Sequence, residues 1–178
     1  MNSSTPKAEI TIKELVIFAM LGAVMFCGDV LMEMLPNIHL VGVLTVVFTL
    51  VYRVKALIPI YLYVFITWLV NGLSLWVLPY WYVWFILWAL VMILPKKMPV
   101  WLQWGVYPVV CMLHGLIFGT LYAPVHAILF DFSFEQTIAW IINGFTFDIL
   151  HAVGNFAGGL LIVPLVAVLK KLNKQAKI

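Results

Sequence analysis

The sequence has little charge and only two cysteines, and each shortage excludes a class of protein. Only 10% of its 178 residues are charged and 65% are hydrophobic, whereas soluble domains carry about 25% charged residues. A water-soluble globule of this composition would lack a polar surface, and disorder requires low hydrophobicity with high net charge. Cys27 and Cys111 lie in apolar runs without C-x-x-C spacing, which favours buried small side chains over a structural zinc site.

Several catalytic motifs are also missing from the sequence. There is no G-x-x-x-x-G-K-[ST] phosphate loop, so ATP hydrolysis by that route is excluded. Neither H-E-x-x-H nor G-x-S-x-G occurs, which argues against common intramembrane metalloproteases and lipases. Asp148 and His151 supply two groups, and two ligands make a poor metal site. We therefore expect no enzymatic activity, metal, cofactor or nucleic-acid partner.

Long apolar runs predict an all-α, polytopic membrane protein that forms one domain over residues 1–178, with 1–14 as a short cytoplasmic segment. At about 20 residues per span, the chain has room for six transmembrane helices and little else. The predicted segments are Leu15–Leu35, Leu40–Tyr52, Ala56–Leu78, Tyr80–Leu94, Val100–Phe130 and Thr137–Leu169. The last two are too long for one crossing, so each should bend, the fifth at Tyr122-Ala-Pro124.

The basic residues predict how these segments are oriented. With six spans, all ten Lys and Arg fall on one side of the membrane. They are Lys7, Lys13, Arg53, Lys55, Lys96, Lys97, Lys170, Lys171, Lys174 and Lys177. The positive-inside rule makes that side cytoplasmic, so we expect both termini to be cytoplasmic. The predicted location is the plasma membrane of a bacterial cell.

The polar residues inside the segments gather at one depth. Counted along each helix at about 1.5 Å per residue, they fall in the outer third of a hydrocarbon layer about 30 Å thick. They are Asp29, Asn71, His114, Asp148, His151 and Asn155. Intramembrane ionisable residues are costly and mark functional sites by default. The sequence therefore predicts a polar cup near the outer face.

The last three of these residues have a structural alternative. Asp148, His151 and Asn155 are spaced i, i+3 and i+7, so they share one helical face. They either line a site or form a polar clasp between helices, because Asn and His can bond neighbouring helices. His39 and His126 lie near the same depth and fit loop or interface positions.

The other polar candidates also have alternatives. Asp29 and Glu33 are one turn apart and either line the site or reach the hydrated interface. His114 stands alone, which favours a satisfied core histidine over a ligand contact. Asn71-Gly72 is either a helix break or a ligand contact.

Aromatic residues crowd the connection between the third and fourth segments. Interfacial belts of Trp and Tyr account for many of them. Those at the outer level are candidates for stacking on a flat ligand, namely Trp76, Tyr80, Trp81 and Trp84.

Small residues recur at four-residue spacing, which lets helices approach closely. Ala19 and Ala23, with Gly22 beside them, form a face on the first segment that either packs internally or meets a partner subunit. The pairs Gly115/Gly119 and Gly154/Gly158 are explained by packing within the chain.

Together, these features resemble the substrate-binding S components of energy-coupling factor (ECF) vitamin transporters. The likeness rests on length, six segments, basic cytoplasmic ends, Ala19-x-x-x-Ala23 and the final segment from Phe147 to Pro164. The resemblance implies an outer ligand pocket, and a partner complex of an EcfT-like membrane scaffold with two cytosolic ATPase subunits docked at the Ala face. ATP hydrolysis would then belong to the partners, and the ligand would be a small-molecule vitamin or precursor.

The resemblance does not identify the vitamin. Segments over Val41–Gly72 lack the Gly- and Pro-rich stretch of many S components. No Lys or Arg maps to the outer level, which favours neutral or cationic ring-containing ligands over anions such as pantothenate. Cobalamin or cobinamide, thiamin precursors, pyridoxine-type and queuine-type compounds stay open. The alternatives are a stand-alone small carrier or channel, and an intramembrane enzyme that uses Asp148 and His151.

Overall fold

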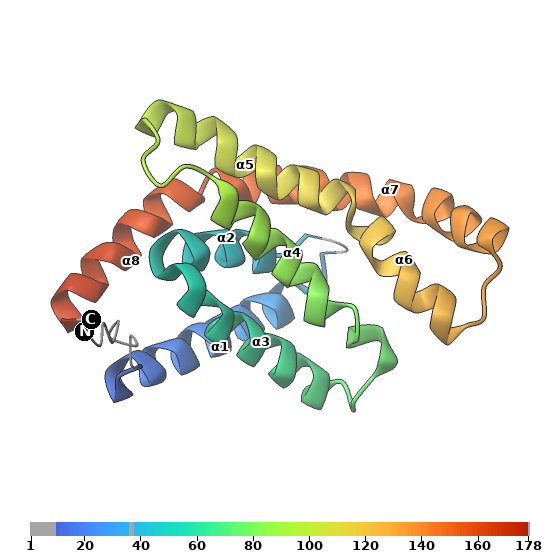
Figure 1. Cartoon of the computed structure of the whole chain (residues 1–178), viewed down its shortest axis with the longest axis horizontal. Coiled ribbons are helices and arrows are strands. Elements are labelled where there is room, and N and C mark those ends of the chain that lie inside the picture. Colours follow the sequence, from blue (N-terminus) through green and yellow to red (C-terminus); the bar gives the residue numbers. More distant parts are fainter. Residues whose placement is uncertain (1–9, 36–37, 178) are drawn as a thin grey trace, which may run out of the picture.

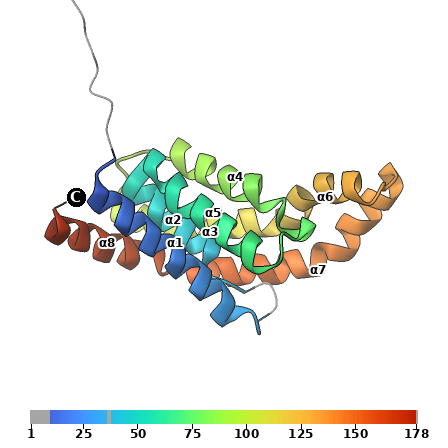
Figure 2. The same cartoon turned by 90° about the horizontal axis from the view of Figure 1, so that it is seen from below.

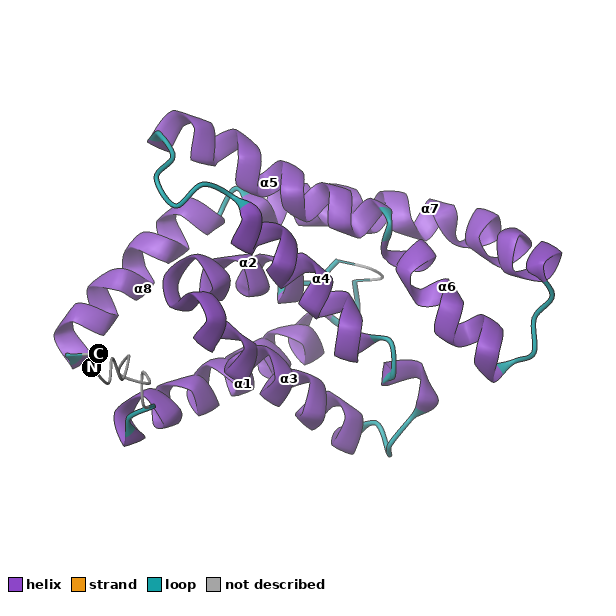
Figure 3. Ribbon diagram, viewed as in Figure 1, coloured by secondary structure: helices purple, strands orange, loops and turns teal. Residues whose placement is uncertain are grey.

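The computed structural model describes residues 10–35 and 38–177, and every regular element in them is helical (Figures 1 and 3). Lys7 and the predicted break at Pro36-Asn37 lie outside the described residues. The helices are α1 (Ile12–Met32), α2 (Val41–Tyr52), η1 (Arg53–Ala56), α3 (Leu57–Val70), η2 (Leu75–Val77), α4 (Tyr80–Ile93), α5 (Val100–Leu116), α6 (Phe118–Leu129), α7 (Phe134–Gly159) and α8 (Ile162–Ala176).

Five helical stretches of the described chain are long and apolar enough to cross a membrane. They are Ile12–Met32, Val41–Val70, Leu75–Ile93, Val100–Leu129 and Phe134–Gly159. The chain is thus a helical protein with several potential membrane spans, as its composition predicts. The 30-residue stretch Val41–Val70 covers nearly all of the predicted second segment and the third up to Val70, and η1 lies where the two meet. The third segment was expected to continue to Leu78, but α3 ends at Val70 and η2 follows.

Two helices begin at capping boxes that can be read from the sequence. Thr11 accepts a hydrogen bond from the backbone N–H of Glu14, whose carboxylate in turn accepts from the Thr11 backbone N–H. Ser133 and Gln136 make the same reciprocal pair at the start of α7. Such pairs satisfy N–H groups that have no partner within the first turn of a helix.

The chain turns sharply where α2 meets η1. Arg53 has a positive φ of 55°, and its guanidinium donates to the Met92 carbonyl at 3.0 Å. Its own carbonyl accepts from the Trp88 indole at 3.0 Å. These bonds tie the turn to the end of α4, and α3 runs back from it beside α1 (Figure 1).

The fifth predicted segment does bend, but the expected position was wrong. The break lies at Ile117, between α5 and α6, rather than at Tyr122-Ala-Pro124. Pro124 lies inside α6, as Pro108 lies inside α5. Proline removes a single backbone donor, which these helices tolerate. The sixth segment also bends as expected, at Leu160–Leu161 between α7 and α8.

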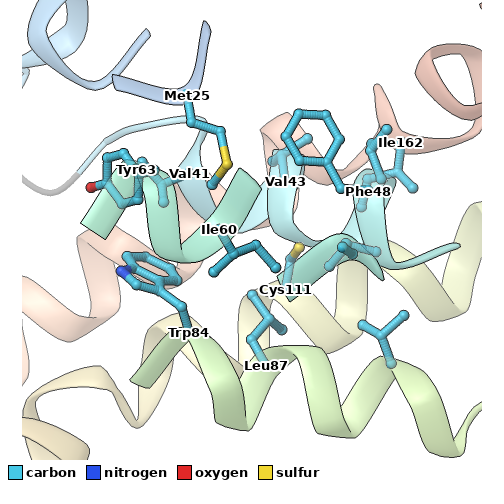
Figure 4. Packing of buried hydrophobic residues seen from close by; sticks show 14 of the residues in the cluster. Met25, Val41, Val43, Phe48, Ile60, Tyr63, Trp84, Leu87, Cys111 and Ile162 are labelled. Carbon is cyan, nitrogen blue, oxygen red and sulfur yellow. The ribbon is translucent and has the colours of Figure 1, made fainter. Parts of the chain in front are cut away.

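The core lies where α2 is surrounded by the other helices. Trp84, Tyr63, Ile60, Leu87 and Met25 are fully buried there (Figure 4). The α6–α7 hairpin projects beyond the ends of α3 and α4 in both views (Figures 1 and 2). This arrangement leaves the sides of α4, α6 and α7 facing one another beside the core.

Candidate functional site

The basic side chains gather at one end of the molecule, and most of the carboxylates lie away from it. Lys55 forms an ion pair with Glu14 at 2.6 Å, and the Tyr52 hydroxyl donates to Asn173 at 2.8 Å. These contacts, with those of Arg53, bring together the start of α1, η1, the end of α4 and α8. All described Lys and Arg belong to these elements or to the loop between α4 and α5. Five of the seven carboxylates lie away from this end, namely Asp29, Glu33, Asp131, Glu135 and Asp148.

A cavity of about 490 Å³ lies between the start of α4, the α5–α6 break and α7. Its lining residues are mostly aromatic: Trp76, Tyr80, Phe118, Gly119, Tyr122, Trp140, Asn143, Gly144, Phe147 and Asp148. Pockets that hold small ligands have about this volume, with apolar walls and few polar groups. We call this space the aromatic cavity.

Asp148 is the carboxylate of the aromatic cavity and is only 5% exposed. Its Oδ1 accepts a hydrogen bond from the backbone N–H of Gly119 at 2.9 Å. The break at Ile117 makes this donor available, because the first N–H groups of a helix have no partner within it. Among the described residues, Oδ2 of Asp148 has no hydrogen-bond partner. A buried acceptor of this kind is costly unless a ligand or water bonds to it.

A residue without a side chain is required opposite Asp148. A Cβ atom at Gly119 would lie 2.6 Å from Oδ2 and 3.0 Å from Oδ1 of the carboxylate. Gly144, in the wall of the same cavity, has no such neighbour: a Cβ atom there would meet nothing within 4 Å. Gly119 therefore has a specific role in placing the carboxylate.

A second cavity of about 480 Å³ lies between α1, the end of α3 and η2. It is lined by Phe26, Asp29, Val30, Glu33, Thr67, Val70, Asn71, Ser74, Trp76, Val77 and Tyr80. We call it the acidic cavity, because it carries two carboxylates. The Tyr63 hydroxyl donates to Oδ2 of Asp29 at 2.7 Å and so fixes one of them.

Asn71 forms the helix break that its sequence position allowed, and it also lies at a cavity. It ends α3, its side-chain amide donates to the Thr67 carbonyl at 2.8 Å, and Gly72 follows with a φ of 67°. It also lines the acidic cavity. The helix break thus places a side-chain amide in the cavity wall.

Tyr80 and Trp76 separate the two cavities, since both residues line both spaces. Tyr80 also borders a smaller space of about 150 Å³ that contains Asp29, His39 and Phe118. The three spaces therefore form one divided cup away from the basic end. Of the predicted site residues, this cup contains Asp29, Asn71, Trp76, Tyr80 and Asp148.

The other predicted site residues lie beneath or beside the cup. Trp84 is fully buried, with its ring centre 5.6 Å from that of Tyr80. His114, also fully buried, lies against Trp84 and bonds the Val83 carbonyl at 3.1 Å. Trp81 packs on Tyr61 and Trp68, to one side of the cavities. These three side chains support the cup from outside its lining.

Asp148, His151 and Asn155 on α7 were expected either to line a site or to form a polar clasp between helices, and they do not all have the same role. They share a face, as predicted, and that face meets α5 and α6. Asn155 donates to the Cys111 carbonyl at 3.2 Å, and His151 packs on Phe118 with 4.6 Å between ring centres. Both side chains are about 1% exposed. Asn155 thus bonds a neighbouring helix as a clasp residue would, whereas Nε2 of His151 has no hydrogen-bond partner among the described residues. Only Asp148 reaches the cavity, because α6 diverges from α5 at that level.

Two histidines were expected in loops or at the interface: His126 is instead buried inside α6, whereas His39 does lie in the loop before α2 and is half-buried. His126 is 2% exposed and packs on Trp76, with ring centres 4.4 Å apart. His39 lies 4.7 Å from His151 between ring centres. The described residues include no group of three or more His, Cys, Asp or Glu that could hold a metal ion.

Among the residues of the cup and its supports that sequence reasoning missed are Tyr63, Tyr122, Trp140 and Asn143. Depth along the helix was a usable signal for Tyr63, which lies eight positions before Asn71. Trp140 and Asn143 gave no signal, because they are expected in any outer belt and become cavity residues only through the α6–α7 hairpin.

The small residues of α1 have two different environments. Ala19 and Ala23 are exposed, whereas Gly22 is buried and a Cβ atom there would lie 3.0 Å from Leu62 of α3. Gly22 therefore packs within the chain and lies apart from the exposed Ala face. Gly115, Gly119, Gly154 and Gly158 also face neighbouring segments, which confirms their internal packing.

Comparisons with protein-family models, with curated proteins and with solved structures find no match to this chain.

Proposed function

We propose that the chain is the solute-binding S component of an ATP-driven, ECF-type importer for a vitamin or cofactor precursor. In this proposal it crosses the bacterial plasma membrane six times with both termini in the cytoplasm. Segments α2 and α3 form separate crossings joined at η1, and α8 follows α7 to the basic end. The protein binds its solute and does not itself hydrolyse ATP.

One observation carries the proposal, namely the divided cup at the end opposite the basic residues. Two adjoining cavities of about 490 and 480 Å³ share the walls Trp76 and Tyr80. Under the positive-inside rule this end faces outward. The cup has the volume, the aromatic walls and the few convergent polar groups that suit capture of a small solute from outside the cell.

The exposed Ala face of α1 supports a partner subunit. Ala19 and Ala23 are one turn apart on an exposed apolar helix, and small side chains let a second helix approach closely. The sequence has no phosphate loop with which to hydrolyse ATP. In this proposal, a scaffold that docks on the Ala face, together with two cytosolic ATPases, supplies the energy for uptake.

The test is the double substitution Ala19→Leu/Ala23→Leu, expressed with candidate scaffold and ATPase subunits. We expect the variant to lose co-purification with the partners and ATP-driven uptake, while it retains bound solute. Val153→Leu is the matched control, because Val153 is 63% exposed on α7, away from the Ala face.

Three results would contradict this proposal. Loss of solute binding with the partners still attached would remove the Ala face from the partner interface. Uptake by the chain alone in vesicles without ATP would favour a stand-alone carrier, and turnover of a compound by the isolated chain would favour an enzyme.

A further inference from the structure

We propose that the solute is an organic cation whose positive nitrogen binds beside Asp148 in the aromatic cavity, with its rings or alkyl groups against the aromatic walls. This inference rests on the proposed function and narrows its substrate class. It starts from a carboxylate that is 5% exposed and has one hydrogen-bonded oxygen and one unpartnered oxygen.

The Asp148 carboxylate has a single donor among the described residues, the Gly119 N–H at 2.9 Å. Burial of an ionised carboxylate is costly unless it is paired and hydrogen-bonded. Within the described chain no Lys or Arg lines the cavity to provide that pairing. A cationic N–H or N-alkyl group of a ligand supplies both the missing charge and a contact to Oδ2.

The cavity walls favour the same class of ligand. Six of the ten lining residues are aromatic, namely Trp76, Tyr80, Phe118, Tyr122, Trp140 and Phe147. Aromatic faces attract cations through their quadrupoles, by about 0.5–2 kcal/mol per contact. An anion would meet the negative faces of the same rings without a counter-ion.

The charges around the cavity also favour a cationic ligand. Asp29 and Glu33 line the adjoining acidic cavity. Low-dielectric walls concentrate the field of charges of one sign and raise the local concentration of opposite charge. The described cup end has carboxylates and no Lys or Arg, so its field attracts cations.

A neutral ligand could instead accept a hydrogen bond from protonated Asp148, and Asp148→Asn separates the two cases. The Asn amide keeps the shape and can donate a hydrogen bond, but it has no charge. A cation should therefore bind the variant about 10- to 100-fold more weakly. A neutral acceptor should bind it about as well as the original chain.

The experiment uses the full chain in lipid nanodiscs and equilibrium dialysis with three probes: benzyltrimethylammonium, benzyl alcohol and benzoate. Empty nanodiscs correct for partition into lipid. We expect saturable binding of the cation, and weaker binding of the neutral and anionic probes. Asp131→Asn is the matched control, because it removes the same charge from a hairpin residue with φ of 53°, a conformation that Asn tolerates. It should bind the cation within about twofold of the original chain.

Three results would overturn the inference. They are equal or tighter binding of benzyl alcohol or benzoate, full retention of cation binding by Asp148→Asn, and no saturable cation binding up to about 10 mM. If Asp148→Asn does not fold, Trp140→Leu takes its place. Loss of that aromatic face should weaken binding of the cation more than binding of benzyl alcohol, because only the cation loses a cation–π attraction. An equal change for the two probes would contradict the inference.

Mass spectrometry of compounds that co-purify with the chain separates this inference from the proposed function. A neutral or anionic compound in a complex with ATPase partners would refute the inference alone. A cationic compound bound to a chain that never associates with partners would refute the importer and leave the inference standing.

Discussion

The contact between Gly119 and Asp148 offers the sharpest test of the cup, through Gly119→Ala. The added methyl would lie 2.6 Å from Oδ2 of Asp148, closer than real Cβ contacts, so the carboxylate or α6 must move. We expect the 2.9 Å bond from the Gly119 N–H to be lost. Overpacking costs about 1–3 kcal/mol, and a hydrogen bond to a charged group contributes about 1.5–3 kcal/mol.

The assay is thermal unfolding in detergent, with solute affinity measured on the same samples. A loss of about 1–3 kcal/mol corresponds to a melting temperature lower by about 2–12 °C in a chain of this length. Gly144→Ala is the matched control, because it adds the same methyl to the wall of the same cavity with no neighbour within 4 Å. Ala is the better helix former by about 1 kcal/mol, so this control should be neutral or stabilising.

A double-substitution cycle shows whether the effect depends on the carboxylate. In the background of Asp148→Ala, Gly119→Ala should cost little, which gives a coupling of about 1–3 kcal/mol. Equal melting temperatures for Gly119→Ala and Gly144→Ala would refute the close approach. An equal cost of Gly119→Ala with and without Asp148 would refute the role of the carboxylate.

Two further predictions concern the packing beneath the cup. Gly159→Ala should lower the melting temperature far more than its control, Gly105→Ala. A Cβ atom at Gly159 would lie 2.6 Å from Cα of Pro108, whereas one at Gly105 would meet nothing within 4 Å. Similar melting curves for the two variants would contradict the contact between α5 and α7. Asn155→Ala should lower the melting temperature, because the Cys111 carbonyl loses its hydrogen-bond donor. The free energy of unfolding should fall by about 1–3 kcal/mol. Solute affinity should change by less than about twofold. A larger loss of affinity at an unchanged melting temperature would identify Asn155 as part of the ligand site.

The sequence was informative wherever the structure depends on local chemistry. Thr11 and Ser133 cap α1 and α7 through capping boxes, so these helices begin before the predicted starts at Leu15 and Thr137, whereas α4 begins after Pro79, as predicted. The shared face of Asp148, His151 and Asn155 also follows from spacing alone. The break in the fifth segment was different, because Pro124 fits inside α6 while the chain bends at Ile117. Nothing near Ile117 in the sequence indicates the distant partner, Asp148, that accepts the Gly119 N–H.

Rotation of each helix about its own axis limited the prediction of the cup. Depth along the chain predicted that Trp84 and His114 line the site, yet both are fully buried and line neither of the two larger cavities. The burial of His126 against Trp76 likewise depends on how the α6–α7 hairpin leans over η2. Such tertiary relations have no local signature, so depth predicted the level of the site and the structure supplies its lining.

The position of Tyr80 has a consequence for size selectivity. Its ring borders all three spaces of the cup, so together with Trp76 it limits how far the spaces open into one another. With the rings in their observed positions, a compact molecule fits on either side of a partition. Rotation of both rings would open a longer chamber from Asp29 to Asp148 and admit an elongated molecule with a charge at each end. The bulk of these two residues would then set the upper molecular size that the protein accepts.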